Sequence, residues 1–420
     1  MNVLIVGGGG REHAFAWSFS KNRNIKKLYC APGNGGIAEL AECLPVSADD
    51  IEGIVRVAKE NSIDLAVIGP EGPLAMGVVD ALLASGIRAF GPNKKCAQLE
   101  ASKAFTKAFL MRHGIPTAKY MEFTDKNELL DAVGIFGFPM VLKADGLAAG
   151  KGVIIAETAD EATTAIERMM GEKVFGAAGE KVVVEEFLRG TEASVLCFVD
   201  EKTIVPMESA QDYKRVFDGD KGPNTGGMGS YSPSLLFDEK LEKKVMNDIL
   251  APTLKGLQSD GLDFKGVLYA GLMITEEGPK VIEFNNRFGD PETQAVLPRL
   301  KTDLLEILLA VTENRLGEAD IKWSDEKSVC VVLASGGYPN SFKKGCIIEG
   351  LGAVESDVTV FHAGTSVQGA NIVTSGGRVL GVTAVAKTHE DAGKKAYENV
   401  TKISFEGMQY RKDIGKINGR

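Results

Sequence analysis

The hydrophobic pattern of the first hundred residues predicts alternating strands and helices. Residues 2–6 are apolar and lead into the glycine turn Gly7-Gly-Gly-Gly-Arg-Glu-His13, after which apolar residues recur at helical spacing. Residues 27–30 and 65–68 are further short apolar runs of strand length. We therefore expect residues 1–101 to form a Rossmann-like βαβ domain that binds a substrate.

The middle of the chain, residues 102–326, predicts two units. A helical pattern begins at Ser102 and ends near His113, and strands then alternate with helices, which predicts a small lid over about residues 118–188. Residues 189–326 combine long glycine-rich loops with apolar strands and predict a catalytic core. Its expected elements are strands at 193–198, 267–274 and 280–285 and a helix at 303–312.

The last part of the chain predicts a small C-terminal α/β domain over residues 327–420. Apolar runs of strand length are followed there by one helical pattern. We expect strands at 329–334, 358–362 and 379–386 and a helix at 389–403. The expected fold class is therefore a multidomain protein of α/β and α+β type.

The segment Val281-Ile-Glu-Phe-Asn-Asn-Arg287 is the most informative strand. Alternation places Glu283, Asn285 and Arg287 on one face, while Ile282 and Phe284 point inward. Carboxylate and amide oxygens suit Mg²⁺, which completes its shell with nucleotide phosphates, and the guanidinium suits a planar anion. The pattern predicts a metal-nucleotide site. The alternative is an ordinary edge strand with a polar outer face, and other segments have to decide between the two.

Composition and charge narrow the class of partner. A chain of 420 residues with 44% hydrophobic and 25% charged residues is ordinary for a globular protein. The net charge of −9 and pI near 5.3 provide no basic field, so nucleic acid is not expected as a partner. Six scattered cysteines suggest reduced, mostly buried thiols. Without a signal sequence or a membrane-spanning run, we expect a cytoplasmic protein with no membrane partner.

The first glycine turn matches a dinucleotide-binding motif poorly. With Gly7 and Gly9 as the first two glycines of the motif, Glu12 occupies the third glycine position, and the second strand is not followed by a ribose-binding acid. A tight turn at a helix N-terminus can still hold a phosphate on its backbone N–H groups, with Arg11 adding charge. The alternative is that the glycines only permit close packing of strand and helix.

Later loops supply further parts of a nucleotide site. The loop from Gly146 to Gly152 has the wrong spacing for a Walker A motif, but it follows Lys143 on an expected strand and could close over phosphates. The alternative is an exposed hairpin. Residues 181–192 offer backbone groups for adenine and Glu192 for ribose hydroxyls, unless they are only a strand end. The loops 211–215 and 222–229 carry mixed charges that could hold a zwitterion.

Several motifs together resemble one family. They are Gly7-Gly-Gly-Gly-Arg-Glu-His13, Gly69-Pro-Glu-Gly-Pro-Leu74, Lys143-Ala-Asp-Gly-Leu-Ala-Ala-Gly-Lys-Gly152, Gln211-Asp-Tyr-Lys-Arg215, Gly222-Pro-Asn-Thr-Gly-Gly-Met-Gly229 and Arg287-Phe-Gly-Asp-Pro-Glu-Thr-Gln294. Over the whole chain the sequence resembles the phosphoribosylamine-glycine ligases, or glycinamide ribonucleotide synthetases, of the ATP-grasp superfamily. The resemblance implies the ATP-grasp fold. It also implies that ATP, glycine and 5-phosphoribosylamine give glycinamide ribonucleotide, ADP and phosphate in purine biosynthesis.

The resemblance also implies roles for single residues. Glu283 and Asn285 would bind Mg²⁺ or Mn²⁺, and Glu192 would bind the ribose of ATP. Other contacts to ATP would come from Lys103, Lys143, Gly150, Lys151, Gly152, Glu185, Glu186, Phe187 and Leu188. The phosphoribosylamine pocket would include Gly9, Gly10, Arg11, Glu12, Pro70 and Glu71. Glycine and its acyl phosphate would contact Asp212, Lys214, Arg287 and Asp290, and the catalytic residues would be Arg287, Lys143 and Asp290.

The implied chemistry predicts a mechanism. Glycine's carboxylate is a poor electrophile, so we expect it first to attack the γ-phosphate of ATP and form glycyl phosphate, which the amine of phosphoribosylamine then attacks. The four histidines are dispersed and lack paired acids, so none is expected to act as a base. We expect a monomer, with a weak dimer as the alternative.

Three competing functions remain at this stage. Another ATP-grasp carboxylate–amine ligase or carboxylase would share the nucleotide site, but the motif from Arg287 to Gln294 opposes it. A nicotinamide-dependent oxidoreductase would leave the central glycine loops unused. A nucleotide-binding regulatory protein without turnover is opposed by the intact set of Lys143, Glu283, Asn285 and Arg287.

Overall fold

The N-terminal residues form a parallel sheet with helices packed on it, as the alternating pattern predicts. In the computed structural model, which describes residues 1–147 and 152–416, its strands lie in the order β3-β2-β1-β4-β5. The central strands are buried along their length, which explains why they are continuous apolar runs. The strands are β1 (Asn2–Gly7), β2 (Lys27–Pro32), β3 (Glu42–Cys43), β4 (Leu65–Ile68) and β5 (Arg88–Phe90). The helices are α1 (Gly10–Phe19), α2 (Ile51–Glu60), α3 (Glu71–Met76), α4 (Val78–Ala84) and α5 (Gln98–Ala101).

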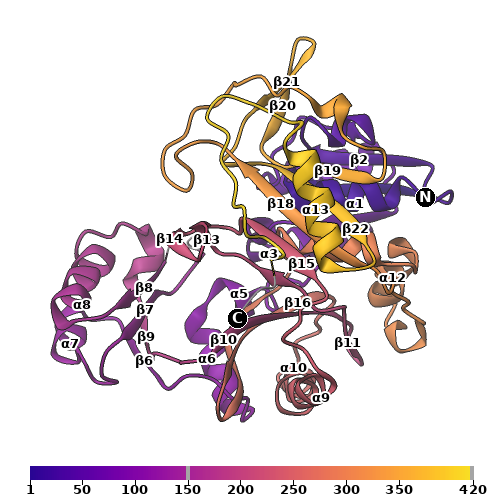
Figure 1. Ribbon diagram of the computed structural model, residues 1–420. Coiled ribbons are helices and arrows are strands. Elements are labelled where there is room, and N and C mark those ends of the chain that lie inside the picture. The colour runs from indigo at the N-terminus through magenta and orange to yellow at the C-terminus, as the bar shows by residue number, and fades with distance from the viewer. Residues whose placement is uncertain (148–151, 417–420) are drawn as a thin grey trace.

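A second unit, the lid, has a core of its own. Its four antiparallel strands lie in the order β6-β9-β7-β8, with two helices packed on them, and Figure 1 shows it set apart from the rest of the molecule. Its buried side chains, among them Leu129, Leu142 and Ile166, form a separate cluster. The elements are β6 (Tyr120–Phe123), α7 (Lys126–Asp131), β7 (Met140–Ala144), β8 (Val153–Ala156), α8 (Ala159–Ile166) and β9 (Val182–Glu186).

Helix α6 (Lys103–Arg112) connects the N-terminal domain to the lid. Ser102 caps it as predicted, because its hydroxyl accepts a hydrogen bond from the Phe105 N–H at 3.0 Å. The carboxylate of Asp145, at the end of β7, accepts from the Ser102 hydroxyl at 3.0 Å and from the Ala104 N–H at 3.1 Å. The start of the lid's glycine loop is therefore fixed to the helix that carries Lys103.

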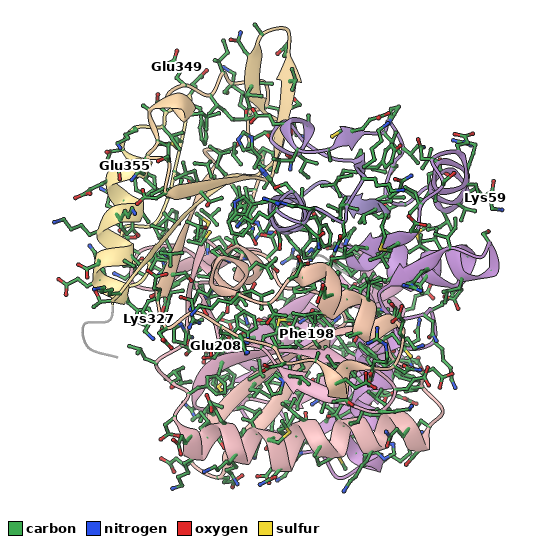
Figure 2. All side chains as sticks on the ribbon, turned by 90° about the vertical axis from the view of Figure 1, so that its right-hand side faces the viewer. Lys59, Phe198, Glu208, Lys327, Glu349 and Glu355 are labelled. Atoms are coloured by element: carbon green, nitrogen blue, oxygen red, sulfur yellow. The ribbon has the colours of Figure 1, made fainter. Side chains whose placement is uncertain are left out.

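The catalytic core is an antiparallel sheet covered on both faces. Its strands lie in the order β11-β10-β16-β17. One face packs on helices α9 and α10, and the other packs on the N-terminal domain and α12. Phe198 belongs to that second face, and Figure 2 shows it deep inside the molecule. The elements are β10 (Thr191–Val199), β11 (Ile204–Pro206), β16 (Gly266–Thr275), β17 (Gly278–Asn285), α9 (Glu239–Val245), α10 (Ala251–Ser259), α11 (Glu292–Val296) and α12 (Leu304–Thr312).

Strand β17 departs from strict alternation. Gly271 pairs with Glu283, but the next residue, Leu272, pairs with Val281, so Ile282 is an extra residue in a β-bulge. The bulge lets Val281 and Phe284 both enter the core, whereas Ile282 is only partly buried. The expectation that Ile282 points inward is therefore wrong. Beyond the bulge, Glu283 and Asn285 share a face as predicted.

The C-terminal sheet includes strands from the middle of the chain. Its order is β12-β15-β18-β22-β19, with one helix packed on it and a separate hairpin of β20 and β21. Because β12 and β15 belong to this sheet, the loops around residues 211–229 are built onto the C-terminal module. The elements are β12 (Gln211–Asp212), β13 (Arg215–Phe217), β14 (Lys221–Asn224), β15 (Gly229–Ser232), β18 (Lys327–Ala334), β19 (Val358–His362), β20 (Thr365–Gln368), β21 (Asn371–Thr374), β22 (Arg378–Ala386) and α13 (His389–Val400).

Candidate active site

Arg287 lies where the core sheet meets the N-terminal domain. Its Nε atom is 3.1 Å from Oε2 of Glu71, and its Nη2 atom is 3.2 Å from Oε1 of Glu100. Its Nη1 atom donates to the carbonyl of Phe288 at 3.2 Å. Burial alone would lower the pKa of Arg287, but Glu100 and Glu71 outweigh it and raise that pKa. The guanidinium is a fixed positive charge that joins two domains.

Two buried lysines share one carboxylate. The Nζ atom of Lys143 is 2.9 Å from Oε1 of Glu185, and that of Lys107 is 3.2 Å from Oε2. Lys143 also donates to the carbonyl of Ile282 at 3.2 Å, which joins the lid to the bulge of β17. Burial lowers the pKa of Lys107 to about 8, although Glu185 opposes that shift. Lys107 therefore balances Glu185 beside Lys143.

Lys103 points toward the glycine loop of the lid. Its ammonium donates to the carbonyl of Gly146 at 2.8 Å. Burial lowers its pKa, and Glu283 opposes that effect. Gly150 and Lys151, which the resemblance assigns to ATP, lie outside the described residues. The carbonyl of Gly152 accepts from the N–H of Ala144 at 2.8 Å, which closes the base of the loop.

Glu283 and Asn285 provide oxygen atoms beside these lysines. Burial would raise the pKa of Glu283, but Lys214, Lys143 and Lys103, together with a hydrogen bond from Asn285, lower it. A carboxylate and an amide oxygen match the ligands that Mg²⁺ prefers. Within residues 1–147 and 152–416, no cluster of three or more His, Cys, Asp and Glu side chains could hold a metal ion.

Glu292 is a site residue that the sequence reasoning missed. Strand β16, which precedes the strand of Glu283 and Asn285, carries no acidic residue. The hydroxyl of Tyr269 on β16 donates to Oε1 of Glu292 at 3.0 Å. The same hydroxyl lies 2.6 Å from Oγ of Ser194. Burial, assisted by the charge of Asp212, raises the pKa of Glu292 to about 7. The sequence feature that could have identified Glu292 is its position in the motif from Arg287 to Gln294.

Asp212 and Lys214 lie together near this acid. Burial raises the pKa of Asp212, although Lys214 opposes the shift. Lys214 also forms an ion pair with Glu192, Nζ to Oε2, at 2.9 Å. Glu192, the expected ribose ligand, is exposed and holds Lys214 here. Lys214 therefore connects Glu192, which is expected to bind the ribose of ATP, with Asp212, which is expected to contact glycine.

The expected border of adenine continues from β9. Glu185 is buried with the lysines, whereas Oε1 of Glu186 accepts from the N–H of Lys119 at 3.0 Å. Phe187 and Leu188 are partly buried, and the guanidinium of Arg189 lies 5.7 Å from the centroid of the Phe187 ring. These residues form a connected edge between the lid and the core.

The glycine turn is closed by Glu12. Its Oε2 atom accepts from the N–H of Gly9 at 2.6 Å, and its Oε1 atom is 2.7 Å from Nε of Arg11. Arg11 also donates from Nη1 to the carbonyl of Phe288 at 2.9 Å. Glu12 occupies the position of the third glycine in a dinucleotide-binding motif. Its side chain instead caps the N-terminus of α1, because it accepts the hydrogen bond from Gly9. The charge of Arg11 is balanced by Glu12, and its contribution to a phosphate site stays a prediction.

A polar cavity of about 340 Å³ opens beside this turn. Gly8 and Gly9 line it, as does Asp290, whose Oδ2 atom accepts from the N–H of Arg11 at 3.3 Å. Gly10 packs against Gln294 instead, Pro70 lies beside Gly7, and Glu71 pairs with Arg287. The sequence reasoning missed the rest of the lining. Two of these residues belong to the N-terminal domain, Gly33 and Asn34. The others come from the C-terminal module: Tyr338, Ala363, Gly364, Thr365, Ser375 and Arg378.

Arg378 joins the cavity to the catalytic motif. Its Nη1 atom donates to the carbonyls of Asp290 at 2.6 Å and Gly226 at 2.7 Å, and lies 3.2 Å from Oδ1 of Asp290. Burial would raise the pKa of Asp290, but Arg378 and Arg11 lower it. Asp290 is therefore a partly buried carboxylate held between the N-terminal and C-terminal modules.

The histidines are less isolated than the sequence suggests. His13 and His362 are in contact, since Nδ1 of His13 accepts from the N–H of His362 at 2.7 Å. His113 lies 3.1 Å from Oδ1 of Asp260, so the expectation that no histidine has an acid partner is wrong. The six cysteines are free thiols and five are buried, which confirms their predicted packing role.

The fold and the site define an ATP-grasp enzyme: the buried Lys143 of the lid sheet lies beside the carboxylate of Glu283 on the core sheet, and Arg287 follows where that sheet meets the N-terminal domain. Family models for phosphoribosylglycinamide synthetase match the chain in three parts, the N domain at residues 1–100, the ATP-grasp (A) domain at 101–293 and the C domain at 328–417. The chain belongs to the phosphoribosylglycinamide synthetase family.

Relatives agree with this assignment. The chain is 49% identical to a phosphoribosylamine–glycine ligase of Caldanaerobacter subterraneus, with 99% of each chain covered, and 50% identical to one of Vibrio vulnificus, covering 99% of this chain and 98% of the relative. The crystal structure of phosphoribosylamine–glycine ligase from Thermotoga maritima superposes with a TM-score of 0.88 at 34% identity, covering 98% of this chain and 100% of that one.

Family membership decides between the competing functions. A biotin carboxylase domain from Hydrogenobacter thermophilus, solved with MgADP, shares the fold with a TM-score of 0.74, but at 18% identity the likeness shows only the fold. The matching ATP-grasp (A) domain model implies that this class of enzyme uses ATP and a divalent metal. Over the described residues, no helix is long and apolar enough to cross a membrane. Monomeric state and cytoplasmic location stay predictions.

The buried acid Glu292 predicts a pH-dependent stability. Because its folded pKa is raised from 4.5 to about 7, ionisation between these values disfavours the folded state, by up to about 3 kcal/mol. Glu292→Gln keeps an oxygen acceptor for Tyr269 but cannot ionise. We expect the stability of the variant, measured by urea unfolding, to rise relative to the original chain as pH increases from 4.5 to above 7. A difference that stays constant over this interval would contradict the assignment.

Proposed function

We propose that this chain ligates glycine to 5-phosphoribosylamine, converting ATP to ADP and phosphate and forming glycinamide ribonucleotide in purine biosynthesis. The observation that carries the proposal is the convergence of Lys143, Glu283 and Arg287 beside Asp290 and the polar cavity. Relatives named for this activity match the chain over nearly its whole length. The family excludes an oxidoreductase, and it opposes a carboxylase.

The nucleotide fits between the lid and the core. Lys143 and Lys103 face Glu283 and can exchange their present partners, a carboxylate and a carbonyl, for phosphate oxygens. Residues 185–188 border the base, and Glu192 is the candidate for ribose. Glu283 and Asn285 would hold Mg²⁺ or Mn²⁺ together with the phosphates. When bound, that ion supplies positive charge that offsets the charge of the triphosphate.

Glycine reacts first at its carboxylate. A carboxylate oxygen bonds to the γ-phosphorus as the bond between that phosphorus and the β–γ bridging oxygen breaks, giving glycyl phosphate and ADP. Lys143, which is buried, and Arg287, which is partly buried, are cations that stabilise the transferring phosphoryl group. Asp212 and Glu292 provide carboxylates for the ammonium of glycine. Lys214 helps to balance them.

Phosphoribosylamine occupies the polar cavity beside the glycine turn. The ribose phosphate suits the backbone of Gly8 and Gly9 together with Ser375 and Arg378 from the C-terminal module. Asp290, which follows Arg287 in the catalytic motif, is among the residues that line the cavity. The amine nitrogen then bonds to the carbonyl carbon of glycyl phosphate, the bond from carbon to the phosphate oxygen breaks, and the nitrogen loses a proton as phosphate leaves.

An omission assay tests the proposed reaction. We expect ADP release to require ATP, a divalent metal, glycine and phosphoribosylamine generated in place, and mass spectrometry to identify glycinamide ribonucleotide as the product. Each component is left out in turn. ADP release that continues at the full rate without glycine would contradict the assigned acid substrate, and release without phosphoribosylamine would contradict the assigned amine.

The role of Lys143 can be tested separately. Lys143→Met keeps an apolar stem and leaves Glu185 paired with Lys107, so the fold should persist. We expect kcat at saturating ATP to fall by about 10²–10³-fold, the usual effect of removing one charge-stabilising group. The control is Lys126→Met, an exposed lysine of the same lid that pairs with Glu167 and should keep full activity. Near-normal turnover of Lys143→Met would refute its catalytic role.

A further inference from the structure

Tyr213 separates two site residues and points the other way. It lies between Asp212 and Lys214 in extended backbone, where successive side chains alternate in direction. Asp212 and Lys214 both interact electrostatically with Glu283, so they face the catalytic core. The Tyr213 ring is buried in the C-terminal module, in a cluster with Val329 and other apolar side chains. Tyr213 therefore fixes the segment to that module from behind.

Arg411, near the end of the chain, lies against this ring. Its side chain is completely buried, and its guanidinium is 4.8 Å from the centroid of the Tyr213 ring. Nη1 donates to the carbonyl of Arg215 at 3.0 Å and to Oδ1 of Asp220 at 2.9 Å. Nε and Nη2 form a bidentate pair with Asp413 at 2.7 and 2.6 Å. One side chain thus contacts the ring, the backbone and the following hairpin.

Backbone groups of the same tail reinforce these contacts. The N–H of Gly415 donates to the hydroxyl of Tyr213 at 3.1 Å, and the N–H of Lys412 donates to Oδ1 of Asp218 at 2.7 Å. Oδ2 of Asp413 accepts from the N–H of Gly219 at 2.9 Å. Residues 411–415 therefore hold the hairpin of β13 and β14 as well as Tyr213.

We propose that Arg411 is a positioning residue for glycine. Through Tyr213 and the carbonyl of Arg215 it sets the position of the backbone that carries Asp212 and Lys214. It touches no reacting atom itself. This inference rests on the proposed function, because it takes Asp212 and Lys214 as glycine contacts. Its consequence is that the tail of the chain determines the affinity for the smallest substrate.

Steady-state kinetics on the full-length chain test the proposal. Arg411→Met keeps an unbranched aliphatic side chain and removes the guanidinium group. We expect the KM for glycine to rise about tenfold while the KM for ATP changes less than about twofold, because the displaced segment would contact glycine directly and reaches the nucleotide only through the exposed ion pair of Lys214 with Glu192. Arg411→Lys keeps the positive charge but lacks the planar guanidinium, so its KM for glycine should lie between those of the unsubstituted chain and Arg411→Met.

A control separates positioning from general loss of stability. Asn399→Leu removes buried hydrogen bonds of the same C-terminal module, to Glu355 and Lys395, without touching residues 211–220. It should lower the thermal midpoint and leave the KM for glycine unchanged. If Arg411→Met shows the same KM for glycine as Asn399→Leu, the proposal is overturned.

A milder variant keeps the proposal testable if Arg411→Met does not fold. Asp413→Asn weakens the bidentate pair but leaves Arg411 its contacts with Asp220 and Arg215. We expect the KM for glycine to rise about threefold, and an unchanged value would overturn the proposal. The original chain is assayed first: if its ADP release does not depend on glycine, the proposed function fails, whatever the variants do.

Discussion

Every charge buried in the site must be balanced before a substrate arrives, and this constraint determines how the site is built. An unpaired ion in the interior costs several kcal/mol, so cations that later meet phosphates need temporary partners. Lys143 and Lys107 share Glu185, Lys103 uses the carbonyl of Gly146, and Arg287 lies between Glu71 and Glu100. In the proposed reaction, ATP and glycine would replace these partners, so few new charges would have to be buried.

The same pairs join the modules of the chain. Arg287 connects the core to the N-terminal domain, Lys143 connects the lid to β17, and Arg378 connects the C-terminal module to Asp290. Each contact that balances a charge therefore also fixes the position of one module relative to another. The C-terminal module is part of the site, because it lines the polar cavity and holds the segment with Asp212 and Lys214.

Local patterns in the sequence predicted most of the elements, including the strand that carries Glu283 and Asn285. The alternation in residues 281–287 indicated that Glu283 and Asn285 share a face, and Ser102 marked the start of its helix. The bulge at Ile282 was not predictable in this way, because it depends on the pairing with β16. Glu12 looked like a defect in a glycine motif, but its role as an internal cap needs the folded turn.

Long-range contacts explain what the sequence could not provide. Glu292 becomes a site acid only because Tyr269, distant in sequence, donates to it. Arg378, Ser375 and Thr365 lie in a part of the chain that offered strands but no recognisable chemistry, and they reach the glycine turn only through the fold. The resemblance to a family named the reaction, whereas the contribution of the C-terminal module required the three-dimensional arrangement.

The central claim is that the site activates the carboxylate of glycine by phosphoryl transfer. The most direct test is to supply glycine labelled with ¹⁸O in its carboxylate and to analyse the released phosphate by mass spectrometry. We predict that a labelled oxygen passes from glycine to phosphate in each turnover, because the carboxylate oxygen stays bonded to phosphorus when the amide forms. Released phosphate without label would contradict a glycyl phosphate intermediate and the account of the site built on it.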